Sequence, residues 1–146
     1  MTTLYLDANI FFYLAEKSSL FYKSCSEFLR YCKKHSISII TSAETVQEIL
    51  HYSKQTKQLG RGIRIIRSSL KLINYLCPVD KEIIEEYLNL ASKYVTLDSR
   101  DLIHLATGIK NQDVVDYIIT YDKKLHTVKD MKSIAPETFL RLTHDI

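Results

Sequence analysis

Four acidic side chains stand beside strand-like or helical segments that lie far apart in the sequence. Asp7 follows the apolar run LYL, and Asp122 follows the run YIIT. Glu48 falls in the second turn of the helix expected after residues 37–41, and Asp101 falls in the first turn of a later helix. Ligands of open α/β sheets bind just beyond the carboxyl ends of the strands, so we expect these four acids to converge at one sheet edge.

Four neighbouring carboxylates indicate metal-assisted chemistry. Without cations they would repel one another strongly and would destabilise the fold. Carboxylate oxygens are ligands that Mg²⁺ and Mn²⁺ prefer. One or two such cations, spaced about 3.5–4 Å apart in two-metal sites, can activate a water and stabilise a leaving oxygen. The acids therefore favour hard cations and a metal-activated water over a covalent protein nucleophile.

Each acid also has a purely structural explanation. Asp7 could cap the helix that follows it, since aspartate is a favoured N-cap residue. Asp98 or Ser99 could cap a later helix, where the negative charge of Asp101 would also suit the helix dipole. Asp122 could open a turn before two lysines. It is the four positions together, rather than any one of them, that favour a functional site.

Two neighbours of these acids are open to more than one interpretation. The spacing of Thr41 and Glu44 matches a capping box, so we predict that Glu44 caps a helix and that Glu48 is the functional acid. His104 lies three residues after Asp101 and so on the same helix face. It could bind a metal, but a zinc site would have softer ligands, and we favour a core or supporting role.

Strand-like and helical patterns alternate along the chain. Strands are expected at residues 3–6, 36–42, 77–79 and 116–122, and helices at 11–34, 43–59, from there to about 75, at 80–94 and at 99–110, with a short strand and helix closing the chain. Gly60 and Gly62 are expected to interrupt the second helical stretch. This alternation implies a parallel sheet covered on both faces. We therefore predict an α/β fold: one domain over residues 1–146, with a central, mostly parallel, twisted sheet of four to five strands and helices on both faces.

The composition is that of a soluble globular protein. Apolar residues make up 46% and charged residues 25% of the 146 residues. The N-terminus lacks the pattern of a signal peptide, and the apolar runs are too short to span a bilayer. Cys25, Cys32 and Cys77 match neither a CxxC pair nor a zinc pattern. We expect buried thiols, a cytoplasmic location and no membrane partner.

The segment between Glu48 and Asp80 contains no acidic residue but six basic ones. These are Lys54, Lys57, Arg61, Arg64, Arg67 and Lys71. Their spacing of three or four positions predicts that they share one helix face. An ordinary solvated face would mix both signs of charge. We therefore interpret this segment as a phosphate-binding face, because neutralisation of the backbone dominates affinity for nucleic acids.

Four stretches of the sequence, taken in order, resemble the acidic signatures of PIN-domain ribonucleases. They are LYLDANIF, TSAETVQEIL, SRDLIHLAT and IITYDKKL, and the resemblance spans the chain from Asp7 to about Leu142. The size and arrangement are most similar to the VapC-type toxins of toxin–antitoxin pairs. The ordered set of four is more specific than any single signature.

The resemblance implies a PIN-like domain and a function. Its metal-binding and catalytic acids would be Asp7, Glu48, Asp101 and Asp122, holding Mg²⁺ or Mn²⁺. Candidates to support them are Asn9, Asp98, His104 and Thr120. The implied activity is that of an endoribonuclease whose products carry 5′-phosphate and 3′-hydroxyl ends, and the implied partners are RNA, a cognate antitoxin and a second copy of the chain in a homodimer.

One residue departs from the family pattern. The family often has asparagine between Thr120 and Asp122, whereas this chain has Tyr121. We expect the change to spare the metal ligands and to alter how the substrate passes the site. Because Tyr121 directly precedes an acid, we single it out as a residue that stacks on a base of single-stranded RNA.

Rival functions of the same fold class fit less well. A phosphoacceptor receiver domain needs an adjacent pair of acids after its first strand, and a haloacid-dehalogenase-type phosphatase needs D-x-D there. The sequence has LDAN at this point, with Asn9 in the second position. The remaining alternative is a PIN-like module that binds RNA or protein without catalysis, and a test for metal-dependent RNA cleavage separates it from an enzyme.

Overall fold

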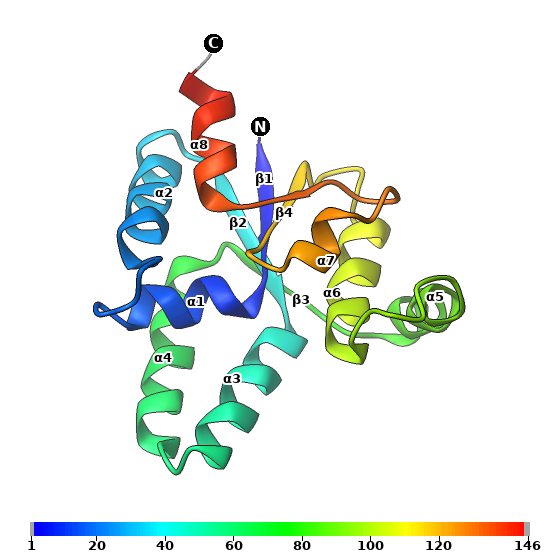
Figure 1. Cartoon of the computed structure of the whole chain (residues 1–146), viewed down its shortest axis with the longest axis horizontal. Coiled ribbons are helices and arrows are strands. Elements are labelled where there is room, and N and C mark those ends of the chain that lie inside the picture. The colour runs from blue at the N-terminus through cyan, green and yellow to red at the C-terminus, as the bar shows by residue number, and fades with distance from the viewer. Residues whose placement is uncertain (1, 145–146) are drawn as a thin grey trace.

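A five-stranded, fully parallel sheet forms the centre of the molecule (Figure 1). The structure is a computed structural model and describes residues 2–144. The strands are β1 (Thr3–Leu6), β2 (Ser38–Ser42), β3 (Tyr75–Cys77), β4 (Tyr117–Ile119) and β5 (Ser133–Ile134). Their order across the sheet is β3-β2-β1-β4-β5. The direction of winding therefore reverses between β1 and β4, the kind of position at which open α/β sheets bind their ligands.

Helices connect the strands and cover both faces of the sheet. They are α1 (Ala8–Ala15), α2 (Tyr22–Lys34), α3 (Ala43–Gln55), α4 (Leu59–Leu72), α5 (Lys81–Lys93), α6 (Ser99–Lys110), α7 (Lys123–His126) and α8 (Pro136–His144). Figure 1 shows α5, α6 and α7 on one side of the sheet and α1 and α2 on the other, while α3 and α4 extend side by side beyond its edge. The predicted α/β fold with a parallel sheet is confirmed.

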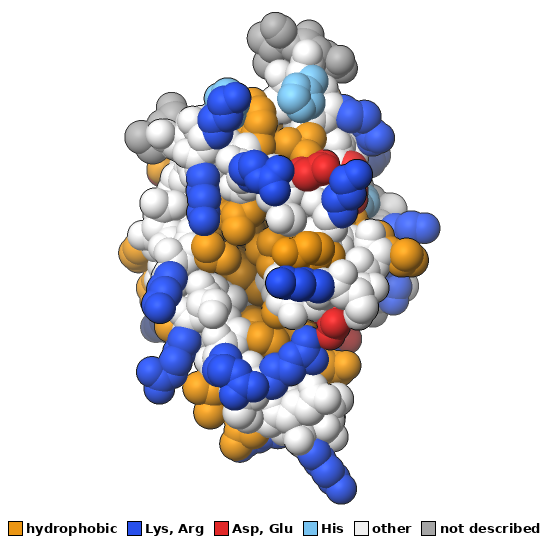
Figure 2. All heavy atoms as spheres, turned by 90° about the vertical axis from the view of Figure 1, so that its left-hand side faces the viewer, with side chains coloured by type: hydrophobic (Ala, Val, Ile, Leu, Met, Phe, Trp, Pro, Cys, Tyr) orange, Lys and Arg blue, Asp and Glu red, His pale blue; other side chains and the backbone are white. Residues whose placement is uncertain are grey.

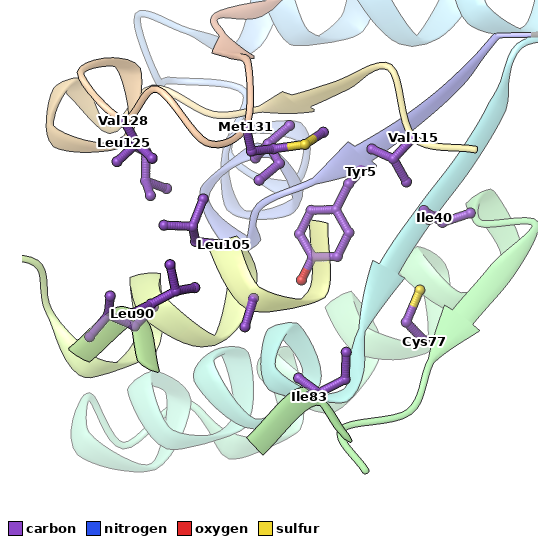
Figure 3. Close-up of a cluster of buried hydrophobic side chains, with 13 residues drawn as sticks. Tyr5, Ile40, Cys77, Ile83, Leu90, Leu105, Val115, Leu125, Val128 and Met131 are labelled. Atoms are coloured by element: carbon purple, nitrogen blue, oxygen red, sulfur yellow. The ribbon is translucent and has the colours of Figure 1, made fainter. Parts of the chain in front are cut away.

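The alternation of side chains along the strands builds two hydrophobic cores. Leu4 and Leu6 of β1 point to the core under α1, α2 and α8, whereas Tyr5 points to the core under α5 and α6. Figure 3 shows Tyr5 at the middle of the second core, with its hydroxyl directed at the helix layer. Ile118 and Ile119 of β4 divide between the two cores in the same way. Successive strand residues face opposite sides, so strands that are apolar at every position feed both cores.

Two of the expected helix boundaries were wrong. The helix expected over residues 11–34 is two helices, and residues 16–21 form the turn between α1 and α2. The second helical stretch is interrupted at residues 56–58, where Lys57 adopts a positive φ of 57°. Gly60 and Gly62 therefore lie inside α4. Gly62 has a packing role instead, because a Cβ atom there would come within 2.0 Å of the Ser53 Oγ atom of α3.

Several smaller expectations hold. The helices expected at 80–94 and 99–110 are α5 and α6. The edge strand expected at 77–79 begins two residues earlier, as β3, and the helix expected to reach about residue 75 ends at Leu72. The short helix α7 had no counterpart among the expected elements. All three cysteines are buried free thiols, as expected.

Candidate active site

Asp7 lies at the carboxyl end of β1, beside the reversal point of the sheet. It is the N-cap residue of α1, and its Oδ1 atom accepts a hydrogen bond from the Ala8 backbone N–H at 2.6 Å. Its Oδ2 atom accepts from the Thr120 hydroxyl at 2.7 Å and from the Asn9 side-chain amide at 3.2 Å. The structural explanation is therefore confirmed, and the functional role of Asp7 stays a prediction. Burial raises the pKa of Asp7, although His104 and Thr120 oppose that shift.

Glu48 and His104 complete a compact group with Asp7. The His104 Nε2 atom lies 3.0 Å from Glu48 Oε1 and 3.3 Å from Asp7 Oδ1. One ligand atom from each of the three residues lies within 4.8 Å of the other two. Glu48 comes from the second turn of α3 and His104 from the middle of α6, so this contact also ties α3 to α6.

A buried hydrogen-bond network contacts the Nδ1 side of the His104 ring, and Nε2 faces the carboxylates. Its Nδ1 atom lies 2.5 Å from the Tyr5 hydroxyl, which donates to Ser42 Oγ at 2.8 Å. Burial alone would lower the pKa of His104, but the neighbouring Tyr5, Asp7 and Glu48 together raise it well above its usual value. The Nε2 atom faces the two carboxylates and the Nδ1 atom faces the Tyr5 hydroxyl, so His104 links the acidic group to the core.

Asp101 and Asp122 form a second acidic pair next to Asp7. Asp122 follows β4, caps α7 by accepting from the Lys124 backbone N–H at 2.9 Å, and has its own N–H bound to the Thr120 hydroxyl. Burial, the hydrogen bond to Asp122, and the charges of Asp122 and Asp7 raise the pKa of Asp101 to about 8. The Asp101 carboxyl is therefore protonated more readily than an ordinary aspartate.

The structure brings all four predicted acids together. Three of the four candidates to support them contact these acids, and the fourth does not. Asn9 and Thr120 hydrogen-bond Asp7, and His104 contacts both Asp7 and Glu48. Asp98 has a different position. It is exposed, it caps α6 through the Arg100 backbone N–H, and it lies 3.8 Å from the Arg100 side chain.

The basic residues of the segment that follows Glu48 do not all share one helix. Lys54 ends α3 and Lys57 lies in the turn, which corrects the prediction that one helix face carries all six. On α4, Arg64, Arg67 and Lys71 are exposed at spacings of three and four. Figure 2 shows the face of the molecule that includes α4, where Lys and Arg side chains surround exposed hydrophobic ones.

Arg61 is the one basic residue of this segment for which the described structure gives an ion pair. Its guanidinium lies 2.7 Å from the Glu16 carboxylate and reaches the Ala15 carbonyl at 3.4 Å. The contact links α4 to the end of α1 across a cavity of about 420 Å³, which is lined by Asn9, Tyr52 and nine other residues. Among the described residues around the acids, Asn9 is the one that lines this cavity. The cavity therefore lies beside the acidic group and does not include it.

Tyr121 packs against two aromatic side chains and hydrogen-bonds a glutamate. Its ring meets Phe21 at 4.4 Å and Tyr13 at 5.4 Å between centroids, and its hydroxyl donates to Glu137 at 2.6 Å. These contacts fasten the loop after β4 to α8 and to the turn between α1 and α2. The stacking of an RNA base on Tyr121 stays a prediction. The base would have to stack on the part of the Tyr121 ring that Phe21 does not cover.

The site fits a hard divalent cation. Its donors are carboxylate oxygens, the ligands that Mg²⁺ and Mn²⁺ prefer, and they are gathered more closely than carboxylates without a cation tolerate. In addition, the Asn9 Oδ1 atom is buried next to Asp7 and accepts no hydrogen bond within residues 2–144. A buried oxygen without a donor is costly, and a bound cation with its water shell could satisfy it.

Sequence reasoning missed three side chains near the acids. Tyr5 and Ser42 hold His104, and the signal for Tyr5 was a polar ring two residues before Asp7 in an otherwise aliphatic strand. The third is Glu44, for which the capping-box prediction was wrong. The N-cap residue of α3 is Ser42, while the Thr41 hydroxyl donates to the Leu6 carbonyl.

Within residues 2–144, no helix combines the length and the apolar character that crossing a membrane requires.

Comparison with known proteins gives a consistent result. The family model described as PIN domain matches residues 4–131. Ribonuclease VapC23 of Mycobacterium tuberculosis is 29% identical over 106 residues, which cover 70% of this chain and 81% of that protein.

Solved structures share the fold. VapBC2 from Rickettsia felis, bound to a DNA fragment from its promoter, superimposes with a TM-score of 0.75 at 14% identity, covering 92% of this chain and 98% of that one. Mycobacterium tuberculosis VapC20, a toxin that cleaves the sarcin–ricin loop, gives a TM-score of 0.68 at 9% identity over 82% of this chain and 89% of that one.

Proposed function

Because the chain belongs to the PIN domain family, we propose that it is an endoribonuclease that hydrolyses RNA phosphodiesters with the help of Mg²⁺ or Mn²⁺. The observation that carries the proposal is the meeting of four carboxylates from four distant segments around the carboxyl end of β1. The ribonuclease relative, VapC23, aligns with this chain over 81% of its own length. The neighbouring VapBC complexes suggest, further, that the chain is the toxin of a toxin–antitoxin pair.

Asp7, Glu48, Asp101 and Asp122 would hold the cation. A divalent cation bound by these acids would supply Lewis acidity, both to activate a water and to neutralise charge that develops on the phosphate. Asp7 is the central ligand, because it contacts His104 directly and its charge acts on both Glu48 and Asp101.

The remaining side chains fix these carboxylates in place. Thr120 and Asn9 hold one oxygen of Asp7, and the α1 cap holds the other. His104, which is wedged against Tyr5, sets the distance between Asp7 and Glu48. Such preorganisation matters because a site that is loose by about 1 Å can lose roughly 100-fold in rate. The raised pKa of Asp101 means that a cation bound beside it would compete with a proton.

The exposed basic side chains of α4 are the proposed contact for the RNA backbone. Arg64, Arg67 and Lys71 project from the helix that lies beside α3, which also supplies Glu48. Neutralisation of phosphates by Lys and Arg supplies most of the sequence-independent affinity for nucleic acids. We place RNA across α4 toward the acids at the end of β1.

The partners and the location belong to the same proposal. The neighbouring structures are complexes of toxins with antitoxins, some of them bound to DNA, and we propose an antitoxin protein as a partner of this chain. We also propose a homodimer and a cytoplasmic location, where RNA is accessible. The dimer is checked by light scattering on the purified chain.

Cleavage of RNA by the purified protein tests the activity. We expect total RNA to be cut in the presence of Mn²⁺ or Mg²⁺ and to stay intact with EDTA. Glu48→Gln should lower turnover by orders of magnitude, and Glu82→Gln on the exposed surface of α5 should leave it unchanged. RNA binding without cleavage under every cation condition would instead support a PIN-like module without catalysis.

A further inference from the structure

Glu44 is a buried acid in the first turn of α3, and it has no structural task in the described part of the chain. Its side chain is only 7% exposed. The helix cap is provided by Ser42, whose hydroxyl accepts a hydrogen bond from the Glu44 backbone N–H at 3.3 Å. The Glu44 carboxylate itself takes no part in any hydrogen bond or ion pair formed within residues 2–144.

The surroundings of Glu44 are those of the acidic site. Glu44 precedes Glu48 by four positions, so the two carboxylates leave α3 from the same face. That face turns toward α6, because Glu48 hydrogen-bonds His104 there. The groups whose charges act on Glu44 are His104, Glu48, Arg100 and Asp98. Figure 1 shows the first turns of α3 and α6 close together at the lower end of the sheet.

No side chain within residues 2–144 pairs directly with the Glu44 carboxylate. Burial raises the pKa of Glu44, and the like charge of Glu48 adds to that shift, against the opposing influence of His104 and Arg100. Arg100 has its closest acidic contact with Asp98, at 3.8 Å. The Glu44 oxygens are not among the fully buried, unpartnered polar atoms of residues 2–144, so they stay open to a ligand, and a carboxylate beside a like charge favours a bound cation.

We propose that Glu44 is a fifth carboxylate of the cation site and binds a hard divalent cation from the same face of α3 as Glu48. The inference rests on the proposed function, because it assumes that the four acids around Asp7 hold such a cation. It extends the site from the end of β1 along the first turns of α3. It also reverses the role that the capping-box pattern gave to Glu44.

Binding of Mn²⁺ to the full chain, measured by calorimetry without RNA, tests this inference. The variant is Glu44→Gln, and the matched control is Glu82→Gln. Both residues are the second residue of a helix that follows a side-chain cap, Ser42 for α3 and Asp80 for α5. Both variants lose a negative charge near a helix N-terminus; Glu82 is exposed and also lies 3.9 Å from the Lys110 ammonium, whereas Glu44 is buried beside the acids.

We expect the Kd for Mn²⁺ to rise at least tenfold in Glu44→Gln and to stay within twofold of the wild type in Glu82→Gln. Without cation, Glu44→Gln should unfold at the same temperature as the wild type or at a higher one, because a buried charge is gone.

A Kd within twofold of the wild type in Glu44→Gln would overturn the inference. A melting temperature that falls further than in Glu82→Gln would overturn it too, since the carboxylate would then stabilise the fold. A wild-type chain that binds no Mn²⁺ would contradict the proposed cation dependence itself. The two failures are therefore distinguishable.

Discussion

At the scale of single residues, the structural roles and the proposed functional roles fall on the same side chains. Asp7 and Asp122 each use a carboxylate oxygen to cap a helix while they lie in the acidic group. The positions of the acids were predictable, because strand ends and helix starts can be located from hydrophobic patterns. The role of Glu44 was not, because a shift of one residue in the helix start, from Thr41 to Ser42, decides whether it caps.

Asp7→Asn should abolish RNA cleavage without unfolding the protein. Asparagine is also a good N-cap residue, so α1 keeps its cap while the site loses one buried charge. We expect Mn²⁺ affinity to fall more than tenfold in calorimetry and the melting temperature of the metal-free protein to stay constant or rise. Asp80→Asn, at the cap of α5, is the matched control and should cleave RNA normally. If Asp7→Asn still cleaved RNA at saturating Mn²⁺, Asp7 would not be a ligand of the cation.

The stability of the metal-free protein should fall as the pH rises from about 4 to about 8. The folded state raises the pKa of Asp101 from 3.8 to about 8, so it binds this proton more tightly than the unfolded chain does. The stabilisation is complete at low pH and is lost as the pH passes through the folded-state pKa. Denaturant unfolding in EDTA across this range should show the decline, with a smaller slope in Asp101→Asn. Equal slopes in the two proteins would show that Asp101 does not hold the proton.

At the scale of elements, helix boundaries were the least predictable feature. The periodicity of residues 43–75 correctly indicated helix, but the glycines suggested a break that occurs two to four residues earlier. Glycine in a sequence signals either a turn or a close approach, and only the packing of α3 against α4 decides between them. The turn between α1 and α2 was missed for another reason, because residues 16–21 contain neither glycine nor proline.

Gly62→Ala should destabilise the protein, and Gly60→Ala should not. A Cβ atom at Gly62 would meet Ser53 Oγ at 2.0 Å and force α3 and α4 apart, which we expect to cost about 1–3 kcal/mol of unfolding free energy. At Gly60 the nearest atom is the end of Arg64, 3.6 Å away, so alanine should gain up to about 1 kcal/mol from helix propensity. Denaturant unfolding of both variants checks this, and a loss at Gly60 as large as that at Gly62 would contradict the close packing.

Replacing Arg64, Arg67 and Lys71 with glutamine should weaken RNA binding for every sequence tested. On a single strand, the slope of log affinity against log salt concentration should shrink by roughly 0.7 for each phosphate that the variant no longer neutralises. The matched control replaces Arg30, Lys33 and Lys34, which are exposed on α2 at the opposite edge of the sheet from the acids. An unchanged slope in the α4 variant, or an equal decrease in the α2 variant, would show that α4 is not the RNA face.

At the scale of the whole molecule, strand order turns four scattered acids into one site. The alternation of strands and helices predicted the parallel sheet, and parallel strands bring their carboxyl ends to one edge. The order of the strands was not readable from the sequence. It places β1 beside β4, and so brings Thr120 and Asp122 next to Asp7. The side-chain network behind His104 depends on this packing and could not be predicted from local patterns.

The chemistry of the cleaved ends is the measurement that tests the central claim most directly. If the acids around Asp7 direct a water at the phosphorus with the help of a divalent cation, no 2′,3′-cyclic phosphate forms, and loss of the 3′-oxygen, which the resemblance to PIN-domain ribonucleases implies, leaves 5′-phosphate and 3′-hydroxyl groups. Purified protein and a defined RNA, with Mn²⁺ or with EDTA, are analysed by mass spectrometry of the fragments. The account predicts these ends with Mn²⁺ and intact RNA with EDTA. Cyclic 2′,3′-phosphate ends, or cleavage that persists in EDTA and in Asp7→Asn, would contradict it.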